Sequence, residues 1–108
     1  MGWIVETMNR IVDTELEELP VDMRARFEYI SGLIEEFGLE RVREPHVKHL
    51  RGPLWEMRLK GKDGISRALY VTAIGRRVVV VRVFIKKTQT TPNREIALAL
   101  KRAKELLQ

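Results

Sequence analysis

The sequence predicts one α+β domain, in which a small antiparallel sheet packs against an N-terminal helical hairpin and a C-terminal helix. The length of 108 residues suits a single domain, residues 1–108. Residues 14–38 repeat apolar side chains at helical spacing, whereas residues 54–85 hold three strand-like runs separated by short turns. Short turns imply antiparallel pairing, and helices gathered before and after the strands predict a helical layer over one face of the sheet.

The N-terminal third predicts a strand followed by two helices. Residues 3–8 form a short run typical of a strand. Thr14 fits the N-cap of a helix, with Glu17 reaching back as in a capping box, and Pro20 interrupts that helix. A second helix over 22–38 ends at glycine and carries one apolar face. The residues of that face are Met23, Phe27, Ile30, Ile34 and Phe37.

The remaining residues predict a connector, three strands and a last helix. The connector covers residues 39–53. The strands cover residues 54–60, 65–74 and 78–85, with glycine-containing turns between them. Thr91 fits the N-cap of the final helix.

Charge is divided unevenly between the two parts of the chain. Residues 1–45 hold 5 Lys/Arg and 11 Asp/Glu, whereas residues 46–108 hold 15 Lys/Arg and 4 Asp/Glu, for a total of +5. A concentrated basic surface attracts polyanions, so RNA or DNA is the expected partner. A surface charged only for solubility is the plainer alternative.

Several other classes of protein are disfavoured by composition. The chain has no cysteine, which excludes disulfides and thiolate metal sites and fits a reducing compartment. Neither a signal peptide nor an apolar run long enough for a membrane span is evident, so we expect a cytoplasmic protein without membrane contact.

Side-chain alternation places basic residues of three neighbouring strands on one face of the predicted sheet. They are Arg58, Lys60, Arg67, Arg82 and Lys86. Phe84 lies between the last two and could stack on a base. Cations that converge on one patch repel each other, so this face is expected to bind an anion. The alternative is a solvated face whose charges protect the sheet from aggregation.

A second cluster of polar residues follows the last strand. Lys86 and Lys87 supply positive charge, and Thr88 can donate to phosphate oxygens. The start of the final helix adds unpaired N–H groups. A plain helix-capping loop would have a similar composition.

We expect structural roles for the remaining candidate residues, which are two histidines and two aromatic residues. His46 and His49 are spaced for a metal, but no third ligand is evident, so we expect exposed or structural histidines and no metal or cofactor. Trp55 and Tyr70 are expected in the core.

Three motifs resemble one known family. Residues 54–58, residues 61–70 and residues 84–92 with Glu95 are similar to HigB-like toxins of the RelE/ParE toxin–antitoxin superfamily. The resemblance runs from the first strand to the last helix, and it implies a RelE-like fold. It also implies a ribosome-dependent mRNA endonuclease that needs no metal and is neutralised by a helix-turn-helix antitoxin.

The resemblance further implies roles for individual residues. Arg67 would stabilise charge on the phosphorane-like transition state, and Lys86 or Lys87 would bind the phosphate or act as general acid. Arg58 or Lys60 would orient the attacking 2′-hydroxyl, or accept its proton if the pKa of the side chain is low enough.

One position departs from the family pattern, because relatives often have histidine where Arg82 stands. An arginine stays charged and cannot readily accept a proton. Acid–base work would then fall on another residue. The candidates are Lys60, Lys86, Lys87, Tyr70 and Glu56. Two other functions remain open on the same fold: a gyrase inhibitor of the ParE type and a non-catalytic basic module that binds nucleic acid.

Overall fold

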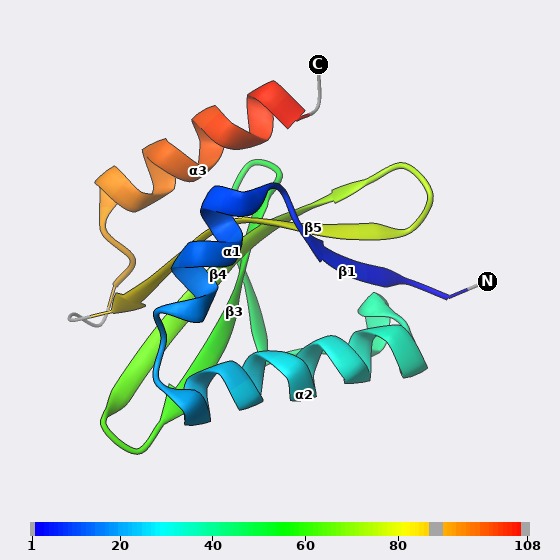
Figure 1. Cartoon of the computed structure of the whole chain (residues 1–108). Coiled ribbons are helices and arrows are strands. Elements are labelled where there is room, and N and C mark those ends of the chain that lie inside the picture. The colour runs from blue at the N-terminus through cyan, green and yellow to red at the C-terminus, as the bar shows by residue number, and fades with distance from the viewer. Residues whose placement is uncertain (1, 87–89, 107–108) are drawn as a thin grey trace.

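A computed structural model describes residues 2–86 and 90–106 and shows a five-stranded sheet with helices on both faces (Figure 1). The strand order is β1-β5-β4-β3-β2. The strands are β1 (Ile4–Thr7), β2 (Val47–Arg51), β3 (Leu54–Gly61), β4 (Gly64–Ala73) and β5 (Arg77–Lys86). The helices are α1 (Arg10–Glu17), α2 (Val21–Phe37), a short 3₁₀ turn (Leu39–Arg41) and α3 (Asn93–Leu106).

The predicted α+β class is confirmed, but the sheet is mixed rather than wholly antiparallel. Strands β2 to β5 pair antiparallel with their sequence neighbours, as their short turns predict. In contrast, β1 runs parallel to β5, with Val5 opposite Val78. Two helices separate β1 from the rest of the sheet, so no hairpin turn constrains its direction.

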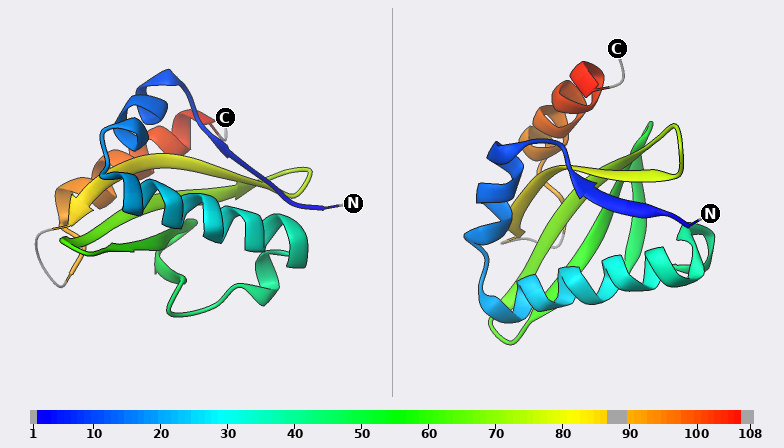
Figure 2. Two further views of the ribbon diagram at one scale, coloured as in Figure 1. Left: turned by 60° about the horizontal axis from the view of Figure 1, so that its bottom comes forward. Right: turned by 45° about the vertical axis from the view of Figure 1, so that its right-hand side comes forward.

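The helices cover both faces of the sheet, not one face as predicted (Figure 2). Side chains of α1 and α2 pack on one face around Met57, Tyr70 and Val80. On the other face, Ala99 and Ala103 of α3 pack against a second apolar cluster. The valine-rich run of β5 supplies both clusters, because successive side chains of a strand point to opposite faces.

The N-terminal helices differ from the predicted antiparallel hairpin. In Figure 1, α2 runs across the lower part of the sheet in a direction different from that of α1. The chain turns between the end of α1 at Glu17 and the start of α2 at Val21. The N-cap of α1 is Asn9, whose side chain accepts a hydrogen bond from the Val12 amide at 3.1 Å, so the prediction of Thr14 was wrong. Gly38 does end α2, with a positive φ of 92°.

The predicted connector contains an additional strand. Residues 47–51 form β2 at the edge of the sheet, where Lys48 lies opposite Glu56. This strand is short and mostly polar, so its sequence lacks the apolar alternation that reveals a buried strand.

A bulge in β5 determines which way its basic residues point. Leu69 pairs with Arg82 and Tyr70 pairs with Val80, which leaves Val81 as an extra residue. Without this extra residue, Arg82 would point to the same face as Val80, which α1 and α2 cover. The bulge instead places Arg82 on the face that α3 covers.

Candidate phosphate-binding site

The sheet register brings three of the predicted cations to one face. Arg58 of β3 lies opposite Arg67 of β4, and Arg67 lies opposite Phe84 of β5. Two pairs further along the strands, and so on the same face, Ile65 is paired on one side with Lys60 and on the other with Lys86. Beyond the effect of burial, the positive charge of Arg58 lowers the pKa of Arg67, and both arginines lower the pKa of Lys86. We call Arg58, Arg67 and Lys86 the cation cluster.

Arg67 is the most deeply buried member of the cation cluster. Only 3% of the residue is exposed. Its Nη1 atom lies 3.2 Å from Oε2 of Glu56, but among the described residues neither Nη1 nor Nε has a hydrogen-bond partner. Burial lowers the pKa of Arg67, while the Glu56 carboxylate opposes this effect. Arginine nevertheless remains charged in proteins, so a fixed positive charge persists here beside Glu56.

Glu56 is a buried carboxylate that contacts both Arg67 and Thr91. Its side chain is 3% exposed, and Oε1 accepts a hydrogen bond of 2.8 Å from the Thr91 hydroxyl. The same carboxylate therefore links Arg67 in β4 to the segment that precedes α3. The prediction of Thr91 as the N-cap of the final helix was therefore wrong: α3 begins at Asn93, and the Pro92 carbonyl accepts hydrogen bonds from amides in the first turn of the helix.

Lys86 lies in an electropositive environment. Burial lowers the pKa of its ammonium group, and the positive charges of Arg67, Arg58 and Lys48 lower it further, with Glu56 opposing. The contribution of Lys48 was missed by the sequence reasoning. The strand that carries it was not recognised, although the basic residue beside a histidine pair was a visible signal.

Two other predicted residues have structural surroundings. Arg82 is held by two acids: its Nε atom lies 2.6 Å from Glu95 Oε1, and its Nη1 atom lies 2.8 Å from Glu15 Oε2. These partners, with Glu95 contributing most, raise the pKa of Arg82. Phe84 is 8% exposed and packs in the cluster beneath α3, so its ring offers little surface for a base.

The other predicted binding residues are placed differently. Lys60 is exposed on the same face as Arg58, at the margin of the cation cluster. Lys87 and Thr88 lie outside the described residues. No group of three or more His, Asp or Glu side chains suited to a metal ion occurs within the described ranges.

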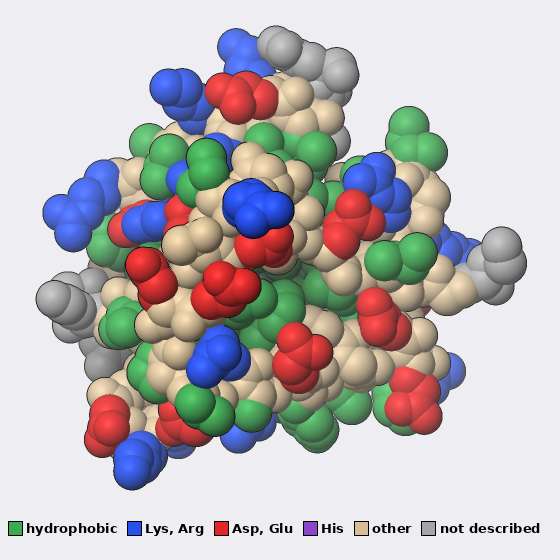
Figure 3. All heavy atoms as spheres, viewed as in Figure 1, with side chains coloured by type: hydrophobic (Ala, Val, Ile, Leu, Met, Phe, Trp, Pro, Cys, Tyr) green, Lys and Arg blue, Asp and Glu red, His purple; other side chains and the backbone are tan. Residues whose placement is uncertain are grey.

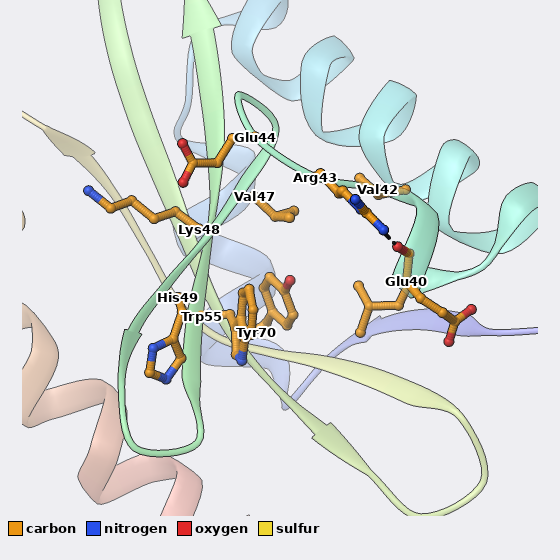
Figure 4. Close-up of a pocket in the computed structure, with 10 residues that line it drawn as sticks. Glu40, Val42, Arg43, Glu44, Val47, Lys48, His49, Trp55 and Tyr70 are labelled. Carbon is orange, nitrogen blue, oxygen red and sulfur yellow. Dashed lines mark hydrogen bonds between the residues drawn. The ribbon is translucent and has the colours of Figure 1, made fainter.

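Tyr70 lies on the opposite face of the sheet from the cation cluster. It lines a largely apolar pocket of about 520 Å³, where the rings of Trp55 and Tyr70 lie next to each other (Figure 4). Tyr70 is buried as predicted, whereas Trp55 is 38% exposed, so the prediction of Trp55 in the core was wrong. The Tyr70 side chain is 1% exposed, and burial raises the pKa of its hydroxyl. A phenol in this position cannot exchange protons with a substrate bound at Arg67.

Acidic side chains concentrate away from the cation cluster. Figure 3 shows several of them over α1 and α2, on the side of the molecule that these helices cover. The cation cluster lies on the other face of the sheet. This separation favours approach of a polyanion to the strands rather than to α1 and α2.

The fold is that of RelE toxins. An Escherichia coli RelE double mutant in the free state superimposes with a TM-score of 0.66 at 20% identity, covering 94% of this chain and 98% of that one. The archaeal RelE of a RelE–RelB complex from Pyrococcus horikoshii gives a TM-score of 0.56 at 21% identity, covering 79% and 96%.

Residues 14–104 match the model of the phage-derived Gp49-like family (DUF891), and the chain belongs to this family. The resemblance to HigB-like members of the RelE/ParE superfamily is thereby confirmed at the level of family and fold. No curated protein sequence matches the chain. Within the described parts of the chain, no helix has the length and apolar character needed to cross a membrane.

Proposed function

We propose that this protein is the toxin of a type II toxin–antitoxin module and cleaves mRNA on the ribosome. The observation that carries the proposal is the cation cluster, in which the buried Arg67 guanidinium lies beside Arg58 and Lys86 on one face of the sheet. Membership of the Gp49-like family and the RelE fold support it. The Pyrococcus relative is bound to RelB, which supports a cognate antitoxin as the partner here. The helix-turn-helix class of that antitoxin rests on the sequence resemblance alone.

The cation cluster suits cleavage by an internal nucleophile. The ribose 2′-hydroxyl gives its proton to solvent water as it attacks the adjacent phosphorus, the bond to the 5′-oxygen breaks as that oxygen takes up a proton, and the products are a 2′,3′-cyclic phosphate and a 5′-hydroxyl. Negative charge increases on the non-bridging oxygens as the phosphorane forms. A positive charge that is already held in place in a poorly hydrated site stabilises that charge most effectively, and this is the role of Arg67.

Arg58 and Lys86 act on the two oxygens that exchange protons. Arg58, directly across the strand pair from Arg67, orients the 2′-hydroxyl. Lys86 donates a proton to the departing 5′-oxygen, and its lowered pKa makes that transfer easier than from an ordinary lysine. Lys87 is the alternative donor on sequence grounds. Glu56 orients Arg67 and does not contact substrate in this scheme.

The test is an mRNA cleavage assay with purified ribosomes, which reads both fragments and their ends. We expect 5′-hydroxyl fragments from the natural protein, and a loss of about tenfold to a thousandfold for Arg67→Gln. Arg77→Gln is the matched control, because Arg77 pairs with Glu6 at the exposed β1 edge, away from the cation cluster.

Three results separate the competing functions. Uncut message together with inhibited supercoiling by gyrase would replace the proposal with a ParE-type activity. Bound but intact RNA would indicate a non-catalytic module. Equal cleavage by the natural protein and Arg67→Gln would remove the assignment of the site while leaving the nuclease function in place.

A further inference from the structure

A small cleft at the sheet edge lies next to the cation cluster and has an unusual lining. Its volume is about 260 Å³. The residues that line it are Arg26, Pro45, His46, Arg58, Lys60 and Ile65. Three of these carry a full positive charge, and no acid lines the cleft. Cations that face one small opening without a carboxylate favour an anionic ligand.

The end of an edge strand creates this opening. The last ladder pair between β2 and β3 joins Val47 to Met57, and the Arg58 amide then donates to the His46 carbonyl at 2.9 Å. Beyond that bond the chain leaves the sheet, so the β3 segment from Arg58 to Lys60 has no neighbouring strand on this side. The exposed edge is accessible to a ligand.

One aromatic ring positions two of the lining side chains. The Arg26 guanidinium lies 5.6 Å from the centre of the Tyr29 ring, and the His46 ring meets the same ring edge-on at 6.1 Å. Both contacts come from outside the sheet, since α2 carries Arg26 and Tyr29. The histidine that the sequence left as exposed or structural is thus held at a basic cleft.

Arg58 belongs to both the cleft and the cation cluster. It lies opposite Arg67 in the sheet, and it also lines the edge cleft with Lys60, two residues along the same face. We infer that the edge cleft is a subsite for a phosphodiester group adjacent to the one held at Arg67. Arg26 and Lys60 neutralise this second phosphate, and the His46 ring hydrogen-bonds it or the neighbouring ribose. The inference rests on the proposed nuclease function, because it requires RNA to lie across the cation cluster.

The test compares two short RNAs that cannot be cleaved. A 2′-O-methyl dinucleotide carries one phosphodiester and a 2′-O-methyl trinucleotide carries two. The natural protein should bind the trinucleotide about tenfold more tightly, as expected for one well-placed charge-assisted contact. Arg26→Gln/Lys60→Gln should lose that gain and still bind the dinucleotide. Its slope of log K against log salt for the trinucleotide should become shallower by about 0.7.

The control removes two positive charges elsewhere. Lys101→Gln/Lys104→Gln alters two exposed lysines of α3 that line neither the cleft nor the cation cluster, so the gain from the second phosphate should persist. Lys60→Glu should turn the gain into a penalty. Equal affinities of the natural protein for the two RNAs, absence of binding to both, or an unchanged gain in Arg26→Gln/Lys60→Gln would each overturn the subsite. The ribosome cleavage assay is an independent measurement. If the natural protein binds the trinucleotide more tightly than the dinucleotide but does not cleave mRNA, the nuclease function is refuted and the subsite is retained.

Discussion

Among the described residues, Arg67 has one acidic partner, Glu56, and two nitrogens without a hydrogen-bond partner. Substitutions of Arg67 can therefore show whether this ion pair stabilises the fold or serves binding. Arg67→Met should lower the free energy of unfolding by about 3–5 kcal/mol, since it leaves the Glu56 carboxylate buried beside a single hydroxyl donor. The double variant Arg67→Met/Glu56→Leu removes both charges and should recover most of that loss.

Urea unfolding of the two variants measures these energies, and the cleavage assay gives the second reading. Both variants should be inactive, although the double variant is well folded. A stable double variant that cleaves mRNA at the natural rate would contradict the role given to Arg67. A double variant as unstable as the single one would show that the pair is retained for folding.

Lys86 should give a pH-dependent stability of defined sign. Its pKa is lowered in the folded protein, so between that lowered value and the ordinary value of 10.5 the unfolded chain binds more protons. The free energy of unfolding contributed by this group therefore rises with pH through that window. Lys86→Gln removes the penalty, and at neutral pH it should be more stable by less than about 1 kcal/mol.

Thermal or urea unfolding of both proteins at pH 7, 9 and 10.5 checks this sign, because other groups titrate equally in the two. The advantage of Lys86→Gln should shrink as pH rises toward 10.5. An advantage that grows with pH would contradict the cationic surroundings described for Lys86. A more stable but less active Lys86→Gln would indicate that the lysine is kept for function.

At the scale of elements, Glu15 joins α1, β5 and α3. Its carboxylate accepts from the Val83 amide at 3.0 Å, Arg82 at 2.8 Å and Arg102 at 2.9 Å. Arg102 also donates to the Val81 carbonyl at 2.8 Å. The pairing of β5 with β1 ends at Val80, so no strand lies beside the following residues of β5 on that side. Glu15 and Arg102 instead bond the Val83 amide and the Val81 carbonyl there, which protects this edge from pairing with another chain.

Replacing this acid should loosen all three elements at once. Glu15→Ala leaves a strand amide and two partly buried guanidinium groups without this acceptor, and we expect a loss of about 2–4 kcal/mol. Glu18→Ala is the control on the same stretch of chain, because Glu18 is exposed and should change stability by less than about 0.5 kcal/mol. Urea unfolding measures both, and equal effects would contradict the bridging role.

The elements that the sequence analysis identified correctly are those with strong local signals. The three central strands and their turns follow from alternation and glycine placement, and the shared face of Arg58 and Arg67 follows from pairing across one hairpin. In contrast, β2 has too little apolar alternation to be recognised. The pairing of Arg82 with Glu15 depends on contacts between segments far apart in the chain, which no local pattern contains.

The direction of β1 and the position of the edge cleft have the same origin. Both depend on where the chain returns after the helices, and this is decided by packing of the whole molecule. The histidine at position 46 therefore looked structural in the sequence. Only the end of β2 and the ring of Tyr29 bring it to Arg58 and Lys60.

At the scale of the whole molecule, the sheet combines very local and very distant pairings. Strands β2 to β5 follow each other through short turns, whereas Val5 of β1 pairs with Val78. Closing so long a loop costs entropy before any contact stabilises it, so β1 should dock after the central strands. Val5→Ala should therefore lower stability by about 1 kcal/mol, almost wholly through faster unfolding.

Stopped-flow folding and unfolding in urea measure the two rates. Val71→Ala is the comparison, since Val71 is fully buried in β4 and should slow folding as well. A Val5→Ala variant that folds several times more slowly while unfolding at the normal rate would show that β1 belongs to the folding nucleus.

The parallel pairing of the first strand also has a consequence for synthesis. Ile4–Thr7 are synthesised well before their partner Arg77–Lys86. A nascent chain therefore lacks the partner of its first strand until β5 has left the exit tunnel. The same strand supplies Lys86, so the cation cluster cannot form on a nascent chain before β5 has emerged from the ribosome.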